Sequence, residues 1–350
     1  MIISSIIKPS VVIGINEMKR GQEMVRAIIG RDPSLLELLQ HLTLLSDHHL
    51  AVHKRAFELA VEQVGATVNF DRIRFAVVLL GSGARGEQLF FSDQDHAFIY
   101  DVMDESPEQA KAWSVYFAQI GNVFSALLHE LGYPLCTGNV MMSNPRWRGT
   151  LQAWEQRIDD YCSYPDWDNI RYLLIASDAK LITGDQTLVN QLRRRVTENI
   201  ARSPYICWKI ADQGLADRAQ GVIFANWREA VGDVTFSIKE RLYTPIVNSV
   251  RLWALSIGIE KISTFSRIEQ LLEKKAWTEE LANEVKTALW DVVALRMRQQ
   301  VNKLNASENN TDVLDDTLLV AKEREALNQS LRTIRKLKQI SIKHFPRPRR

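Results

Sequence analysis

The apolar positions of the chain change their spacing near residue 73. Upstream, leucines recur every three or four residues in 34-SLLELLQHLTLLSDHHLAVHKRAFELAVEQV-64, which is the spacing of an amphipathic helix. Ser34 can cap that helix, with Glu37 three positions later as its capping-box partner. The run 73-IRFAVVLLG-81 is short, rich in β-branched residues and closed by glycine, so it predicts a buried strand. We therefore expect helices over residues 16–65 and a sheet that begins at residue 73.

The middle of the chain alternates between strand-like and helix-like segments. A second apolar run, 95-DHAFIYD-101, predicts another strand. A helix is expected to begin after Ser106, which a proline follows, and to stop at Gly132. The segment 133-YPLCTGNVMMSNP-145 predicts a strand and a turn, and residues 147–162 are expected to be helical.

The last part of the chain has a mostly helical pattern. An apolar segment at 170–185, which ends in a polar turn, precedes this helical part of the chain. Helices are expected at 186–200, 206–230, 238–258, 264–275, 278–305 and 316–340. The polar stretch 306-ASENNTDVLDD-316 is expected to be a loop.

Composition restricts the class of protein. The chain has 350 residues and a net charge of +2, whereas a dedicated nucleic-acid-binding protein is usually strongly basic. The basic end 343-KHFPRPRR-350 is interpreted as a solvated tail. No uncharged run approaches about 18 residues, and residues 1–20 lack a signal-peptide pattern, so we expect a cytoplasmic protein without a membrane span. The cysteines lack C-x-x-C spacing and fit a reducing compartment; they are Cys136, Cys162 and Cys207.

The stretch 79-LLGSGARGEQLFFSDQDHAFIYD-101 carries the candidate chemistry. It contains a literal G-x-G-x-x-G from Gly81 to Gly86, and Asp101 follows about twenty residues on, as in a dinucleotide-binding turn. Such a turn needs a parallel crossover of about a dozen residues or more, mostly helix. Only residues 87–94 lie between the last glycine and the second strand. The spacing therefore disfavours dinucleotide binding.

Phosphate and metal chemistry uses every unusual residue of this stretch. Gly81 and Ser82 end a strand and turn the chain, so that backbone N–H groups can cradle nucleotide phosphates. Arg85 adds a fork-shaped donor for a phosphate or for an internal carboxylate. Asp93 and Asp95 are two residues apart, and the period of a strand places them on one face. There they could share Mg²⁺, which prefers a few carboxylates with water and phosphate oxygens. The alternative is a glycine-rich hairpin turn with exposed acids.

Four histidines in the N-terminal helical region suggest a second metal site. Two of them, His49 and His53, are four residues apart and would share a helix face. The accompanying glutamate of an H-E-x-x-H arrangement is missing, so this site is disfavoured. The remaining two are His41 and His48.

The pattern G-S-x-x-R-x-E-x5-D-x-D, from Gly81 to Asp95, resembles the signature of the DNA polymerase β-like nucleotidyltransferase superfamily. It has the form found in bacterial PII-protein uridylyltransferases and glutamine-synthetase adenylyltransferases. The chain is most similar to a related family of bacterial nucleotidyltransferases, often fused to CBS or cyclic-nucleotide-binding domains, which are not expected here. The resemblance covers roughly residues 30–340. The further matching stretches are 133–154, 176–188, 251–255 and 295–300.

This resemblance implies a fold and a division into domains. The fold class is α+β, with a polymerase β-like mixed sheet and helices, an N-terminal helical segment and a C-terminal all-α domain. We expect the N-terminal helical segment at 1–66, the catalytic nucleotidyltransferase domain at 67–188 and the helical substrate-binding domain at 189–350.

The resemblance also implies an activity. The chain would be a transferase, [protein-PII] uridylyltransferase-like, that uses Mg²⁺ or Mn²⁺ to move NMP from an NTP to a protein or small-molecule acceptor with release of pyrophosphate. Asp93 and Asp95 would be catalytic and hold the metal. The nucleotide-binding residues would be Gly81, Ser82, Arg85 and Glu87. The preferred NTP, the acceptor and the oligomeric state stay open.

The third catalytic carboxylate of the superfamily is the part that the sequence does not provide clearly. The strand expected to carry it corresponds to residues 133–141, which contain no acid; Cys136 and Asn139 lie where one would be sought. Asp178 is the next candidate, although a structural role suits it better. The alternative function is therefore a catalytically inactive nucleotide-binding regulatory module.

Overall fold

The structure is a computed structural model of the chain. It describes residues 19, 35–65, 73–90, 92–102, 106–215, 235–305, 313–315 and 319–349. Several sequence-based expectations fall wholly or partly outside these residues. They are the N-terminus with the Ser34 cap, the end of the 206–230 helix and the 306–316 loop.

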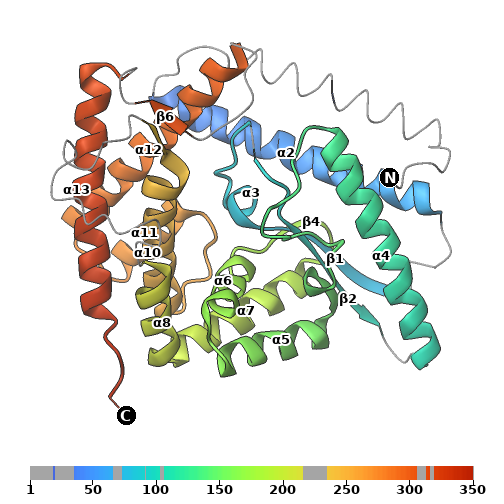
Figure 1. The fold of residues 1–350 in the computed structure, drawn as a ribbon. Coiled ribbons are helices and arrows are strands. Elements are labelled where there is room, and N and C mark those ends of the chain that lie inside the picture. The colour runs from blue at the N-terminus through green and yellow to red at the C-terminus, as the bar shows by residue number, and fades with distance from the viewer. Residues whose placement is uncertain are drawn as a thin grey trace. The chain divides into compact units, whose positions relative to one another are not determined.

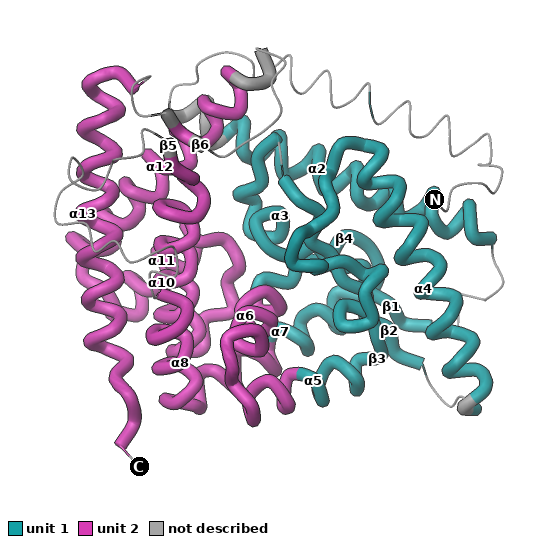
Figure 2. The backbone as a smooth tube through the Cα atoms, viewed as in Figure 1, with its two compact units in different colours: residues 1–157, 178–193 teal, residues 158–177, 194–350 magenta. Residues whose placement is uncertain are grey.

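The chain forms two compact units (Figure 2). Unit 1 comprises residues 1–157 and 178–193, and unit 2 comprises residues 158–177 and 194–350. Each unit is described by itself below. Among the described residues, no helix has the length and apolar composition needed to cross a membrane.

Unit 1 is built on a four-stranded mixed sheet with the strand order β3-β2-β1-β4 (Figure 1). The strands are β1 (Ile73–Leu79), β2 (His96–Val102), β3 (Arg148–Thr150) and β4 (Lys180–Gly184). β1 pairs antiparallel with both β2 and β4, whereas β2 and β3 are parallel. The two strands expected at 73–81 and 95–101 are thus confirmed as β1 and β2. Because these two strands are antiparallel, the parallel crossover of a dinucleotide-binding turn is excluded.

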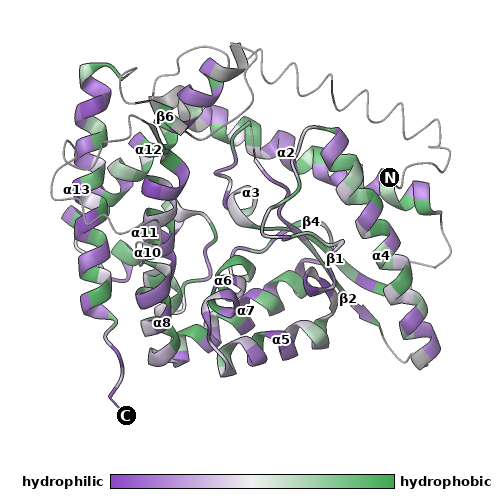
Figure 3. Ribbon diagram, in the orientation of Figure 1, coloured by the Kyte–Doolittle hydropathy of each residue, from purple (hydrophilic) through white to green (hydrophobic). Residues whose placement is uncertain are grey.

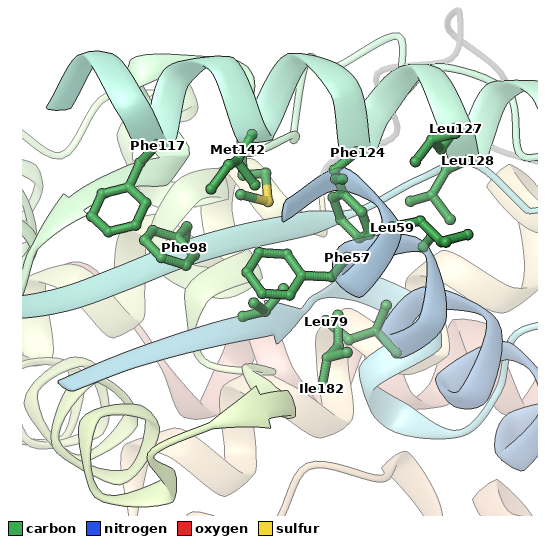
Figure 4. Packing of buried hydrophobic residues seen from close by; sticks show 14 of the residues in the cluster. Phe57, Leu59, Leu79, Phe98, Phe117, Phe124, Leu127, Leu128, Met142 and Ile182 are labelled. Atoms are coloured by element: carbon green, nitrogen blue, oxygen red, sulfur yellow. The ribbon is translucent and has the colours of Figure 1, made fainter. Parts of the chain in front are cut away.

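Helices α2 (Leu35–Val64) and α4 (Pro107–Glu130) pack against each other in unit 1. The start of α4 is confirmed, because the Ser106 hydroxyl accepts from the Gln109 N–H and the Gln109 side chain accepts from the Ser106 N–H. Figure 4 shows that both helices contribute side chains to one core with the strands. At its centre, Phe57 of α2 and Phe117 of α4 pack against Phe98 of β2, and Phe124 of α4 packs against Phe57.

The strand expected within residues 133–145 is wrong. Residues 133–144 form an irregular loop, which we call the 133–144 loop, followed by a 3₁₀ turn (Pro145–Trp147) and β3. A turn breaks the segment, because Asn139 has φ 55° and its N–H donates to the Cys136 carbonyl at 2.8 Å. Strand-like composition was therefore misleading here, and the next helix starts later than expected, at the first residue of α5 (Leu151–Ser163).

Unit 2 is mainly helical, with a two-stranded antiparallel ribbon of β5 (Thr235–Ser237) and β6 (Val313–Asp315). Its helical pattern is confirmed where it is described. The elements that lie in it wholly are α6 (Trp167–Ala176), α8 (Pro204–Gly214), a π-helical turn (Lys239–Tyr243), α10 (Thr244–Ser256), α11 (Thr264–Glu273), α12 (Glu279–Asn305) and α13 (Ala321–His344). Helices α5 and α7 (Gln186–Arg202) have residues in both units. Figure 3 shows hydrophilic and hydrophobic residues alternating along α13, whose buried positions include Leu327, Ile334 and Leu337.

Candidate active site

The glycine-rich stretch forms a single helical turn at the end of β1. Helix α3 (Gly81–Arg85) follows directly on Leu80, whose N–H donates to the Asp95 carbonyl at 2.9 Å. Gly86 ends the turn in the left-handed region, with φ 71°. The N–H groups of residues 81–83 open the helical turn, so they have no intrahelical acceptor. Ser82 is partly exposed beside them, and the turn can therefore offer N–H groups and a hydroxyl to an anion.

Gly81 lies directly against the side chain of Asp95. Its φ is +57°, and a β-carbon placed on it would be 2.4 Å from the Asp95 Oδ2. No side chain can occupy that position without displacing the carboxylate. The glycine turn and the second acid of the Asp-x-Asp pair, which are 14 residues apart in the printed sequence, therefore meet in space.

Asp93 and Asp95 lie on the approach to β2, just before its first residue. Both are partly exposed, whereas Gln94 between them is fully buried. This alternation is the two-residue period of an extended chain, so both carboxylates belong to the accessible side. Two partly exposed carboxylates with room for water are the donor set that Mg²⁺ prefers when substrate phosphates complete its shell.

Among the described residues, no group of three or more His, Cys, Asp or Glu side chains is arranged to hold a metal ion. In the part of the chain that the structure describes, the candidate metal ligands are thus the two aspartates, without a closed cage around them. A divalent ion that keeps several waters and shares phosphate oxygens with a nucleotide fits such a site, and a fully enclosed structural metal does not.

Arg85, Glu87 and Asp178 form a buried ion-pair cluster. The Arg85 Nε donates to Glu87 at 2.8 Å, and its Nη1 donates to Asp178 at 2.6 Å. The exposed fractions of the three side chains are at most 5%. One guanidinium therefore joins the end of α3 to Asp178, two residues before β4, and the cluster holds the glycine turn in place from behind.

Cys136 lies beside Asp95. Burial, followed by the charge of Asp95, raises the pKa of the Cys136 thiol to about 12, and a hydrogen bond between the two side chains acts in the same direction. The thiol stays protonated at neutral pH and cannot act as a base. Asn139, the other residue considered in this segment, is exposed, and its carbonyl accepts from the Asn144 side chain.

The histidines of α2 are tied to the protein interior. His49 Nδ1 lies 2.7 Å from the Tyr133 hydroxyl, and its Nε2 lies 3.2 Å from the Leu89 carbonyl. His53 Nδ1 donates to the His49 carbonyl at 2.7 Å. Burial lowers the pKa of His49 to about 3 and that of His53 to about 4. The two contacts of His49 link α2 to residues 89 and 133, whereas the bond of His53 stays within α2.

The structure thus brings Asp95 against Gly81, with Ser82 next to Gly81 in the turn and Asp93 two residues before Asp95 on the same accessible side of the chain. It places the other three sequence-predicted site residues, Arg85, Glu87 and Asp178, in the buried cluster behind the turn. Sequence reasoning did not find the contact between Arg85 and Asp178, because no local pattern reports a pair that is 93 residues apart.

Two family models match the chain. "Putative nucleotidyltransferase DUF294" matches residues 19–168, and "Putative nucleotidyltransferase substrate binding domain" matches residues 221–345. The first range contains the glycine turn and both aspartates of the Asp-x-Asp pair. No curated protein matches the chain significantly.

Proposed function

The chain belongs to the nucleotidyltransferase family that these two models describe, and from that premise we propose that it is a metal-dependent nucleotidyltransferase. It moves a nucleoside monophosphate from an NTP to a hydroxyl group and releases pyrophosphate. The observation that carries the proposal is the contact between Gly81 and Asp95, because it joins a backbone turn with N–H groups that lack intrahelical acceptors to a carboxylate. A hairpin turn with unrelated exposed acids has no need for that contact.

The turn supplies the triphosphate site. The N–H groups of Gly81 and Ser82 and the Ser82 hydroxyl donate hydrogen bonds to phosphate oxygens. Arg85 and Glu87 support the turn through the buried cluster. The ion pair with Asp178 favours the same supporting role for that residue over the role of a third catalytic carboxylate.

Asp93 and Asp95 would hold Mg²⁺ or Mn²⁺ beside the turn. A bound ion would supply positive charge that offsets the negative charge of the transferring nucleotidyl group. The chain's own contribution is to keep the two carboxylates fixed and accessible, with Asp95 held against Gly81. The carboxylates therefore need little rearrangement when substrate binds.

The transfer exchanges one phosphorus–oxygen bond for another. The acceptor oxygen bonds to the α-phosphorus, and the bond from that phosphorus to the α–β bridging oxygen breaks. Pyrophosphate leaves with the electron pair, and the hydroxyl proton passes to solvent water. The acceptor is a protein, as in the PII uridylyltransferases that the chain resembles, or a small molecule.

A regulatory module that binds nucleotides without transferring them is the second candidate. The observation that favours it is Cys136, which lies at Asp95 where the superfamily's third acid is expected. This candidate predicts NTP binding that Asp93 and Asp95 support, with no release of pyrophosphate.

The test is release of pyrophosphate from each of the four NTPs with Mg²⁺ or Mn²⁺. It compares wild type with the Asp93→Asn/Asp95→Asn variant, in cell lysate depleted of small molecules and in the same lysate after their return. Release that needs both aspartates supports transfer, and its dependence on the small-molecule fraction separates protein from metabolite acceptors. Absence of release together with calorimetric NTP binding would favour the regulatory module.

The matched control is Asp101→Asn. Asp101 lies near the far end of β2, whereas Asp93 and Asp95 come just before the strand begins, and Asp101 is paired with Arg74 at 3.2 Å. Its substitution is expected to leave pyrophosphate release within about twofold of wild type, because exposed ion pairs contribute only about 0–1 kcal/mol.

A further inference from the structure

The two residues that alternate with the aspartates point the other way and are completely buried. Gln94 and His96 both have an exposed fraction of 0%. Neither touches a nucleotide in the function proposed above. Burial of two polar side chains is costly unless each finds hydrogen-bond partners, so their partners show what they do.

Gln94 is held by hydrogen bonds of its side-chain amide and of its backbone N–H. Its Nε2 donates to the Ser125 carbonyl and to the Tyr133 carbonyl, both at 3.0 Å. Its backbone N–H donates to the Pro134 carbonyl at 3.0 Å. Both amide hydrogens of the side chain and the main-chain donor are thus used. They tie the residue between the aspartates to α4 and to the start of the 133–144 loop.

His96 continues the same network. Its Nδ1 accepts from the Met142 N–H at 3.0 Å, so the proton of the neutral ring is on Nε2. That Nε2 then donates to the Gln94 Oε1 at 3.1 Å. The His96 backbone N–H donates to the Val140 carbonyl at 3.1 Å. One imidazole therefore joins Gln94 to the far end of the 133–144 loop.

These bonds act on the chain segment that presents the aspartates. The 133–144 loop is bonded to residue 94 at its first part and to residue 96 at its last part, and Cys136 in between lies at Asp95. On the other side, the Asp95 carbonyl accepts from Leu80. The segment is therefore clamped on both flanks while its carboxylates stay accessible.

We propose that Gln94 and His96 are positioning residues. By hydrogen-bonding the chain segment that carries Asp93 and Asp95 to the 133–144 loop, they fix the direction of the two carboxylates. This inference rests on the proposed function, since it assigns the clamp to the site that binds the metal and the nucleotide. Residues that hydrogen-bond metal ligands from outside typically contribute about 10–100-fold to metal affinity, and Gln94 and His96 act in a similar way through the backbone that carries the two aspartates.

The test measures metal binding directly rather than turnover. The free Mn²⁺ signal in electron paramagnetic resonance is followed during titration of each protein, alone and with α,β-methylene analogues of the four NTPs. Gln94→Leu and His96→Phe are expected to raise the Mn²⁺ dissociation constant about tenfold or more. His96→Gln keeps a donor where the Nε2 of the ring was, so its loss is expected to be smaller than that of His96→Phe.

The control is Trp154→Phe. The Trp154 indole N–H donates to the Phe98 carbonyl of the same strand at 3.2 Å, also in a buried position of unit 1. This variant loses a buried hydrogen bond to β2 away from the aspartates, so its Mn²⁺ affinity is expected to equal that of wild type. The free energy of unfolding is measured for all variants, so that a general loss of stability is separated from a local effect.

Each outcome is decisive. If wild type binds Mn²⁺ and Asp93→Asn abolishes binding, while Gln94→Leu and His96→Phe bind as wild type does, the positioning role is wrong and the proposed function stands. Equal weakening in Trp154→Phe would also overturn it. If wild type binds no Mn²⁺ even with the nucleotide analogues, the metal-dependent function itself fails. Should Gln94→Leu not fold, the comparison of His96→Gln with His96→Phe decides alone.

Discussion

Gly81 and Asp95 approach so closely that a β-carbon on residue 81 would stand 2.4 Å from the Asp95 Oδ2. The backbone turn that is proposed to hold phosphates and the carboxylate that is proposed to hold the metal therefore share one space. A nucleotidyltransferase needs both within reach of a single triphosphate. The contact is a second reason, besides the left-handed backbone, why position 81 requires glycine, because even the methyl group of an alanine would displace the Asp95 carboxylate.

Gly81→Ala is expected to lower kcat/KM about 100-fold, since displacement of a reacting group by about 1 Å can have that effect. Gly132→Ala is the matched control. Gly132 also has a positive φ, 86°, but its added β-carbon would meet nothing within 4 Å. Both variants carry backbone strain of about 1–2 kcal/mol, so similar thermal unfolding with very different rates would isolate the contact with Asp95. Equal rates in the two variants would contradict it.

The buried ion-pair cluster predicts which of two substitutions lowers the free energy of unfolding more. Arg85→Met leaves the Glu87 and Asp178 carboxylates buried without their shared cation, and loss of one partner of a buried pair costs about 3–5 kcal/mol. Asp178→Asn leaves the pair of Arg85 and Glu87, so we expect it to cost less. Urea unfolding measures both values.

The Asp178→Asn variant also distinguishes a structural role of Asp178 from a catalytic role. If the carboxylate supports the turn, the loss of rate in Asp178→Asn is expected to follow its loss of stability, and NTP affinity falls with kcat. A fall in kcat by several orders of magnitude with unchanged unfolding and unchanged nucleotide affinity would instead show that Asp178 acts as the third catalytic acid.

Local patterns predicted the parts of the site that are close in sequence. The apolar run at 73–79 is a strand, and the short spacing up to Asp95 correctly disfavoured a parallel crossover. The 133–144 loop was missed, because its apolar residues resemble those of a strand. Its bonds to Gln94 and His96 are individual hydrogen bonds and do not form the ladder of a strand pair. Such contacts join segments about 40 residues apart, and no periodicity records them.

The histidines of α2 predict a dependence of stability on pH. The pKa is lowered to about 3 for His49 and about 4 for His53, whereas an unfolded histidine has a pKa of about 6.5. Below about pH 6.5 the unfolded state therefore binds more protons, and the free energy of unfolding falls as the pH falls towards the folded-state values. Each histidine contributes up to about 1.4 kcal/mol per pH unit to that slope.

His53→Asn tests this slope. Asparagine can keep the donor to the His49 carbonyl but does not titrate, so we expect a smaller loss of stability between pH 7 and pH 5 than in wild type. Identical slopes in wild type and His53→Asn, from urea unfolding at both pH values, would contradict the assignment.

Cys136→Asp is predicted to strengthen the metal site. The new carboxylate would lie beside Asp95, where two like charges repel each other without a cation. We therefore expect a lower melting temperature without metal, and a larger increase on addition of Mn²⁺ than in wild type. Cys136→Ser adds no charge and should respond as wild type does. An increase in Cys136→Asp that is no larger than in Cys136→Ser would show that Cys136 does not lie at the metal.

The most direct test of the account follows the fate of each phosphate of the NTP. Wild type and Asp93→Asn/Asp95→Asn are incubated with Mg²⁺, cell lysate and an NTP labelled either at the α- or at the γ-phosphorus. Nucleotidyl transfer predicts that the α-label becomes attached to an acceptor while the γ-label appears in pyrophosphate, and that both results disappear in the double variant. Attachment of the γ-label to the acceptor, or equal labelling by the double variant, would contradict the proposed function.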